Sequence, residues 1–146
     1  MKYFQGRFRP KNPNKYLGDS ENIIYRSSYE YRIMLYFDEN PSVISWASEE
    51  FSIPYVSPLD KSWHRYFPDF IIKAKSKNGQ TKTIVIEVKP YAQTLPPNYG
   101  EKPSRRYLRE IMTWGVNEAK WKAAKEFCLD RGWEFQIITE KDLNIK

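Results

Sequence analysis

Apolar residues recur at helical spacing in two regions of the chain. The first region follows Ser27-Ser28-Tyr29-Glu30, a capping box in which Ser27 can cap a helix and Glu30 lies three residues later. This helix is predicted to end at Asn40-Pro41. The second region predicts a short helix over residues 104–113 and a longer helix over residues 117–131, which ends at Gly132.

Alternating apolar and polar residues predict strands in the rest of the chain. The predicted strands span residues 43–47, which residues 51–55 can continue, and residues 66–74, 83–89 and 133–139. Lys77-Asn78-Gly79-Gln80, between the second and third strands, is typical of a hairpin turn. The order helix, three strands, helix and strand predicts an α/β domain in which helices flank a mixed central sheet.

The length and charge of the chain indicate how many domains it forms and what kind of partner it binds. The chain has 146 residues, which predicts a single domain over residues 1–146. Its 24 lysines and arginines outnumber its 18 aspartates and glutamates, and the net charge of +6 favours a polyanionic partner, nucleic acid before membrane. Residues 1–17 hold basic but no acidic side chains and are predicted to be irregular, as part of a basic N-terminal arm over residues 1–24.

Several kinds of site are excluded by the composition. The chain has one cysteine, Cys128, and one histidine, His64, so it can form neither an internal disulfide nor a zinc site of cysteines and histidines. No apolar run is long enough to span a bilayer, and the N-terminus lacks the apolar core of a signal peptide. These features predict a soluble intracellular protein.

Charged residues occur on two predicted strands where the pattern calls for apolar ones. Glu87 and Lys89 lie two residues apart, on one face of their strand, and Asp69 lies among apolar residues of the preceding strand. A three-residue loop, residues 77–79, places Asp69 opposite Glu87, whereas a two-residue Asn-Gly turn places it opposite Val88, on the other face. Asn-Gly is compatible with both turns, and the three-residue loop would bring the two acids together.

Two carboxylates in contact repel each other unless one takes a proton or a cation lies between them. A divalent cation with oxygen ligands meets this need, and Mg²⁺ binds few protein carboxylates together with phosphate oxygens. Such an ion activates water and stabilises the leaving oxygen in phosphodiester hydrolysis. We therefore expect Asp69 and Glu87 to bind a metal ion and Lys89 to orient the water or neutralise the phosphate.

The pair Pro68-Asp69 and Glu87-Val88-Lys89 resembles the signature of the PD-(D/E)XK nucleases. The order of elements also resembles the αβββαβ, restriction-endonuclease-like core of that superfamily. An acidic residue of the first helix often joins the site in these enzymes, and Glu30 occupies that position. Its place in the capping box explains Glu30 equally well.

Further stretches resemble the head-completion nucleases of T-even-type tailed phages. This resemblance implies Mg²⁺-dependent cleavage of DNA, with Mn²⁺ able to replace Mg²⁺, and a role in head completion after DNA packaging. It also implies portal and neck proteins as partners, and the host cytoplasm or the virion as the location. The similar stretches are Tyr25-Arg26-Ser27, Trp46-Ala47-Ser48-Glu49, Ile53-Pro54-Tyr55, Arg65-Tyr66-Phe67, Glu87-Val88-Lys89-Pro90, Thr113-Trp114-Gly115-Val116-Asn117 and Lys120-Trp121-Lys122-Ala123-Ala124.

Other polar residues are weaker candidates. Glu49 lies in a stretch that matches the family and can approach the metal, although exposed acids are ordinary between strands. Asn117 and Lys120 share one face of the long helix, where the resemblance makes a phosphate contact plausible. Two groups rich in arginine suit binding to the DNA backbone; they contain Arg7, Arg9 and Lys11 in the arm, and Arg105 and Arg106 after the third strand.

Two other functions fit the same sequence. One is a non-catalytic head or neck protein that binds DNA or the portal, and the other is a branched-DNA resolvase or transposon-type endonuclease. The presence of Asp69, Glu87 and Lys89 together favours an enzyme over a scaffold, because a decayed site usually loses one of them. Assays with linear, nicked and branched DNA would separate the two kinds of enzyme.

Overall fold

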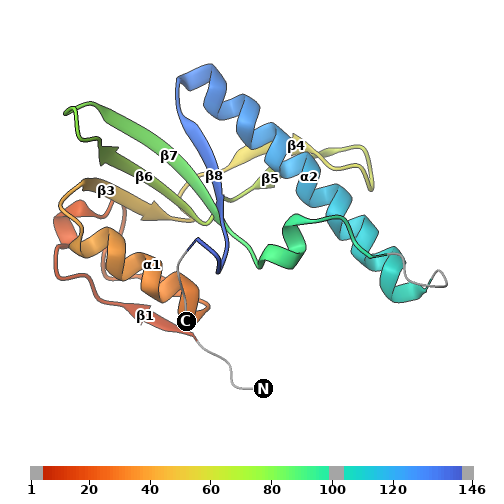
Figure 1. The fold of residues 1–146 in the computed structure, drawn as a ribbon, viewed down its shortest axis with the longest axis horizontal. Coiled ribbons are helices and arrows are strands. Elements are labelled where there is room, and N and C mark those ends of the chain that lie inside the picture. Colours follow the sequence, from red (N-terminus) through yellow and green to blue (C-terminus); the bar gives the residue numbers. More distant parts are fainter. Residues whose placement is uncertain (1–4, 99–103, 143–146) are drawn as a thin grey trace.

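A four-stranded mixed sheet forms the centre of the computed structural model, which describes residues 5–98 and 104–142 (Figure 1). Its strands are β3 (Val43–Ser48), β6 (Phe70–Lys75), β7 (Thr81–Val88) and β8 (Glu134–Ile138). They are ordered β3-β6-β7-β8, and only the β7–β8 pair of this sheet is parallel. The predicted mixed α/β architecture is confirmed.

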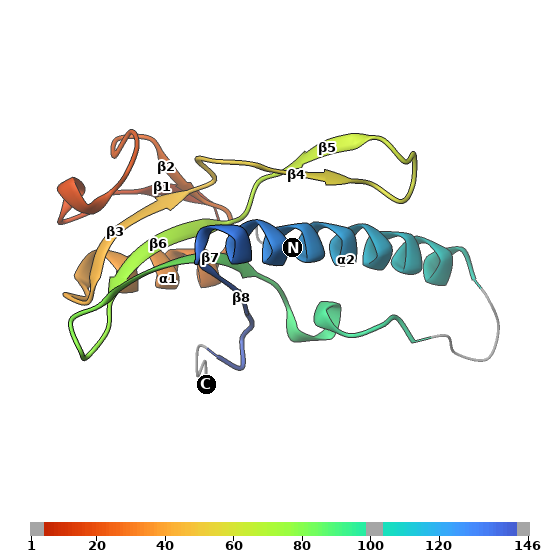
Figure 2. The ribbon, with the colours of Figure 1, turned by 90° about the horizontal axis from the view of Figure 1, so that it is seen from above.

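Two long helices, α1 (Ser28–Glu39) and α2 (Arg105–Arg131), cover opposite faces of this sheet (Figure 2). Neighbouring residues of a strand point to opposite faces. Ile86 of β7 accordingly belongs to the apolar cluster beneath α1, whereas Val85 belongs to the cluster beneath α2. Among the described residues, no helix has the length and apolar character needed to cross a membrane.

The start of α1 confirms the predicted capping box. The backbone N–H of Glu30 donates to the Ser27 hydroxyl at 3.1 Å, which satisfies one of the free donors of the first turn. The helix ends at Asn40, as predicted, where the backbone turns to an extended conformation.

The turn between β6 and β7 is the three-residue loop that places Asp69 opposite Glu87. Lys75 pairs with Thr81, and the pairing continues in step to Phe70 and Ile86. Gly79 has a φ of 85°, a left-handed conformation that glycine adopts without steric cost. The register therefore extends to Asp69 and Glu87, one position beyond the last paired residues.

The strand predicted over residues 66–74 is confirmed as β6 only from Phe70 onward, because the chain enters the central sheet after Pro68. Proline has no backbone N–H to donate to a ladder. β5 (Trp63–Tyr66) ends before it and pairs with β4 (Ile53–Val56) in a separate hairpin. Residues 51–55, expected to continue the first strand, lie in and just before this hairpin, which packs against α2.

The two helices predicted over residues 104–113 and 117–131 form one continuous helix, α2. Gly115 lies inside it, where glycine costs about 1 kcal/mol relative to alanine but interrupts no hydrogen bond. Ser104 caps its start by accepting from the N–H of Tyr107 at 3.0 Å, and Gly132 ends it with a φ of 72°. Because α2 is uninterrupted, its first half extends beyond the sheet (Figure 2).

The irregular structure predicted for residues 1–17 of the arm is wrong for the residues that the structure describes. β1 (Gly6–Phe8) pairs with β2 (Ile23–Tyr25), and a 3-10 helix, η1 (Pro13–Lys15), lies between them. Phe8 and Tyr16 are buried against Trp46, with ring centroids 5.8 Å and 4.7 Å from it. The arm is therefore part of the core beneath α1.

The buried carboxylate of Asp38 fastens this N-terminal segment to the end of α1. It accepts hydrogen bonds from the backbone N–H groups of Lys11 (2.8 Å) and Asn12 (3.0 Å). The Asn12 amide in turn donates to the Asp38 carbonyl at 2.9 Å. These bonds join residues that lie far apart in the sequence.

We expect the substitution Asp38→Ala to lower the free energy of unfolding by about 2–3 kcal/mol, because two hydrogen bonds to a charged acceptor are lost. Urea denaturation measures this change. Glu39→Ala is the matched control: its ion pair with Lys11 is exposed, so its effect should stay below about 1 kcal/mol. Equal effects of the two substitutions would contradict the anchoring role of Asp38.

Candidate functional site

Asp69 and Glu87 lie side by side at the ends of two neighbouring strands. Asp69 directly precedes β6, Glu87 is the penultimate residue of β7, and the two carboxyl groups are within hydrogen-bonding reach of each other. The backbone N–H of Val88 also donates to Asp69 Oδ2 at 2.7 Å. Glu87 is buried and Asp69 is half-buried.

The surroundings of Asp69 and Glu87 favour a state in which one carboxyl group is protonated or a cation neutralises the pair. Burial raises the pKa of the Asp69 carboxyl, and the hydrogen bond and negative charge of Glu87 raise it further, partly opposed by the N–H of Val88. Within the described residues, neither carboxylate has a lysine, arginine or histidine within ion-pair distance. The pair therefore needs either a proton or a cation.

The wall of the site is formed by Tyr66 of β5. Its buried hydroxyl lies beside Glu87, and burial, the charge of Glu87 and a hydrogen bond with Glu87 raise the pKa of Tyr66. Lys120 of α2 places its Nζ 5.8 Å from the Tyr66 ring and 5.9 Å from that of Tyr55, within range of a cation–π interaction. Lys120 was predicted from the sequence as a phosphate contact, whereas Tyr66, although part of a stretch that resembles the family, was not predicted as a site residue.

Lys89 is held beside the pair by its backbone. It follows β7 directly, and its N–H donates to the carbonyl of Ile138 at 2.9 Å, which extends the ladder with β8. Lys89 is half-buried and lies two residues after Glu87, so it shares the face of Glu87 if the strand alternation continues. In the described part of the chain, its ammonium forms no ion pair within 4.0 Å.

Glu30 and Glu49 lie at the edge of the site. Glu30 accepts a hydrogen bond from the Ser27 hydroxyl at 3.3 Å, and burial and the charge of Glu49 raise its pKa. Its charge also contributes to the raised pKa of Asp69. Glu49 instead forms an ion pair with Arg26, and its backbone N–H donates to the Asp69 carbonyl at 3.2 Å.

Two carboxylates, rather than three, are therefore brought together. Among the described residues, no group of three acids, histidines or cysteines is placed to hold one metal ion. Asp69 and Glu87 together fit a hard divalent cation whose other ligands are water or phosphate oxygens. A metal-binding role for Glu49 and a catalytic role for Glu30 stay predictions.

The candidate DNA-binding residues fall into two separate groups (Figure 1). Arg7, Arg9 and Lys11 lie in and after β1, where Lys11 pairs with Glu39 at 3.4 Å. The second group lies on α2, at the other end of the molecule. It comprises Arg105, Arg106, Asn117 and Lys120, of which Arg105 and Arg106 are exposed and Asn117 is buried.

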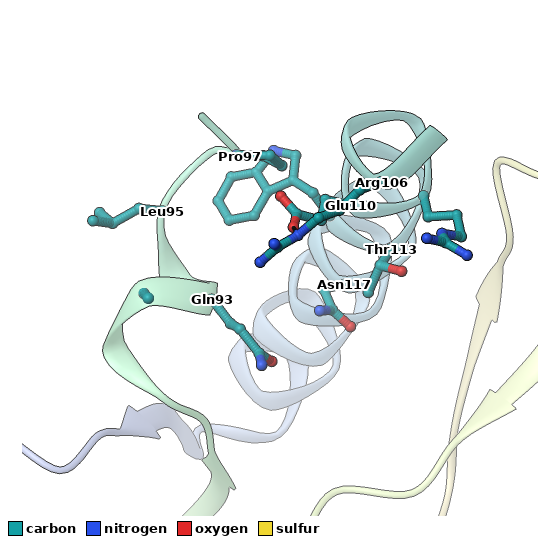
Figure 3. Close-up of a pocket in the computed structure, with 10 residues that line it drawn as sticks. Gln93, Leu95, Pro97, Arg106, Glu110, Thr113 and Asn117 are labelled. Carbon is teal, nitrogen blue, oxygen red and sulfur yellow. Dashed lines mark hydrogen bonds and ion pairs between the residues drawn. The ribbon is translucent and has the colours of Figure 1, made fainter. Parts of the chain in front are cut away.

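A groove borders the second group. It lies between the first half of α2 and a 3-10 helix, η2 (Tyr91–Thr94) (Figure 3). Pro90 alone separates this 3-10 helix from Lys89. Asn117, Thr113 and Gln93 line it. Neither Thr113 nor Gln93 was predicted as a site residue, although Thr113 belongs to a stretch that resembles the family and lies four residues before Asn117.

Comparison with known proteins gives two findings. A family model described as the N-terminal domain of TnsA-like endonucleases matches residues 40–140. A relative, the head completion nuclease of Enterobacteria phage T4, is 40% identical over 144 residues, which cover 96% of this chain and 93% of that protein. The matched region contains Asp69, Glu87 and Lys89.

The raised pKa of Asp69 predicts a stability that depends on pH. Ionising Asp69 opposes folding, so stability is lost as the pH rises from its unfolded pKa of about 3.9 through the higher folded value. We expect Asp69→Asn to be more stable than the wild type near pH 8 without divalent ions, by about 1.4 kcal/mol for each unit of raised pKa.

Thermal melting at pH 4 and pH 8 in a chelator measures this difference, which should shrink at pH 4. Glu118→Gln, on an exposed part of α2, is the control and should leave stability nearly unchanged at both values. A less stable Asp69→Asn protein at pH 8 would show that the two carboxyl groups do not repel each other.

Proposed function

The chain belongs to the TnsA-like endonuclease family, and from this premise we propose that Asp69, Glu87 and Lys89 form a metal-dependent centre that hydrolyses DNA. The observation that supports it is the contact between the two carboxyl groups at the ends of β6 and β7, without a basic side chain to neutralise them. A buried arrangement of this kind is costly unless a cation or proton compensates it. Catalytic sites, unlike purely structural ones, gain from such an arrangement.

The donor set suits Mg²⁺, with Mn²⁺ as a substitute, because both ions take carboxylate, water and phosphate oxygens. When bound, such an ion lowers the pKa of water and stabilises charge on the leaving oxygen. Asp69 and Glu87 would hold it. The N–H of Val88 orients the Asp69 carboxylate, since its bond to Oδ2 fixes one of the two oxygens.

Lys89 and Tyr66 have separate roles in this proposal. The Lys89 ammonium donates to the attacking water or to the scissile phosphate, where negative charge increases in the transition state. Tyr66 supports Glu87 from the opposite wall and excludes water from one side of the pair. Glu30 adds negative charge near Asp69 and so strengthens the need for a cation.

The arrangement of elements supports the same assignment. In chain order, α1, β3, β6, β7, α2 and β8 follow the αβββαβ order of a restriction-endonuclease-like core, with the β4–β5 hairpin inserted after β3. Asp69 lies just before β6 and Glu87 near the end of β7. Arg7, Arg9, Lys11, Arg105, Arg106 and Lys120 would then contact the phosphates of the DNA.

The biological setting is proposed from the phage relative. Identity of 40% over nearly the full length of both chains supports the same role, completion of phage heads, for this chain. DNA is the substrate, and the portal or neck of the head would be the site of action. The protein would then work in the host cytoplasm during assembly.

We expect purified protein to nick or linearise plasmid DNA with Mg²⁺ or Mn²⁺ and not in a chelator. Glu87→Gln and Lys89→Ala should each reduce the rate by at least about 100-fold, because their charges act on the reacting groups. DNA affinity in the absence of divalent ions should change by less than about threefold for Lys89→Ala, since its charge matters chiefly in the transition state.

Agarose gels measure cleavage, and melting temperatures identify variants that fail to fold. Lys82→Ala is the matched control: this lysine of β7 is exposed and pairs with Glu134, far from the acids. A folded Lys89→Ala protein that cuts at the wild-type rate would exclude the proposed centre and leave a non-catalytic DNA-binding role.

A further inference from the structure

The groove between η2 and α2 has the lining of a nucleic-acid site. It encloses about 470 Å³. Pro97 and Trp114 supply apolar surface, and the Trp114 ring is held by an edge contact with Trp121 at 6.4 Å. Gln93 and Thr113 supply polar groups, Arg106 and Arg109 supply positive charges, and the one carboxylate of the lining, Glu110, is paired with Arg106. Aromatic surface beside positive charge is what a single nucleic-acid strand requires, because bases stack and phosphates are neutralised.

Asn117 is the strongest indication that the groove holds a ligand. Its side chain is only 8% exposed and lines the groove (Figure 3). Within the described part of the chain, its amide has no hydrogen-bond partner. The two donors and the acceptor of this amide are therefore left to water or to a ligand in the groove. Nucleotides offer matching groups on base edges, sugars and phosphates.

The groove leads to the carboxylate pair along one face of α2. Arg109, Thr113, Asn117 and Lys120 follow one another at helical spacing, and at 1.5 Å per residue they extend over roughly 16 Å. Lys120 lies over the Tyr66 ring, and Tyr66 borders Glu87. The stripe therefore connects the groove with the proposed catalytic centre.

Arg109 is the basic residue of the groove that is free to bind a ligand. Its neighbour Arg106 pairs with Glu110 at 2.9 Å, whereas Arg109 has no ion pair among the described residues. A protein segment could also fill an apolar groove, but a cation and an unused amide in line with the carboxylates favour a phosphodiester chain.

On the basis of the proposed nuclease function, we propose that this groove binds one unpaired DNA strand next to the scissile phosphate. The groove, with its volume of about 470 Å³, has room for a short stretch of a single strand. The preferred substrate is then duplex DNA with a single-stranded extension or gap beside the cut.

Fluorescence anisotropy in a chelator tests the proposal without cleavage. The probes are a blunt duplex and the same duplex with a single-stranded extension at its 5′ or its 3′ end. Wild-type protein should bind one of the extended forms about tenfold more tightly than the blunt one. Asn117→Ala and Arg109→Ala should lose most of this preference, so that each variant binds the blunt and the extended duplex within about twofold of each other.

Lys122→Ala is the matched control, since it removes one positive charge from an exposed position of the same helix, outside the groove. It should weaken binding of both probes equally and keep the preference. Equal binding of blunt and extended DNA by the wild type would overturn the proposal. If both groove variants keep the preference for extended over blunt DNA, the proposal is also overturned, and a protein segment becomes the better occupant of the groove. Because no cleavage is measured, these outcomes do not depend on the catalytic centre.

Discussion

The contact between the carboxyl groups of Asp69 and Glu87 is the constraint on which the rest of this structure depends. Two acids in a buried position repel each other, and only a rigid frame keeps them together. The frame is the β6–β7 hairpin: its three-residue turn sets the register, and the N–H of Val88 holds one oxygen of Asp69. β3 and β8 pair with the outer edges of this hairpin, so neither strand can slide to relieve the repulsion.

The elements around the sheet complete the site. α1 brings Glu30 near Asp69, and the β4–β5 hairpin brings Tyr66 beside Glu87. α2 then lies along both the hairpin and the groove, because it continues unbroken past Gly115 (Figures 2 and 3). A single helix therefore carries Lys120 over the carboxylate wall and Asn117 into the groove. The proposed proton, metal ion and DNA strand would all bind near the end of β7.

The sequence was informative where short-range rules decide the structure. Ser27 and Glu30 predicted the start of α1, and Gly79 allowed the turn that brings Asp69 opposite Glu87, because capping and turn chemistry act within a few residues. It was misleading where tertiary packing decides. The burial of Phe8 and Tyr16 against Trp46 orders a segment whose composition suggests an irregular arm. Tyr66 was missed because its position beside Glu87 follows from a strand that ends at Pro68, and no local pattern encodes that approach.

In the proposed centre, Asp69 and Glu87 would share a proton until a divalent ion replaces it. Ion binding to such a pair releases protons, because carboxylate ligands must be deprotonated. Calorimetric titration of Mn²⁺ near pH 7, in buffers of different ionisation enthalpy, counts the protons released. The account predicts release by the wild-type protein and weak binding without release by Asp69→Asn. Binding of Mn²⁺ by the wild type with no proton release, or equally tight binding by Asp69→Asn, would contradict it.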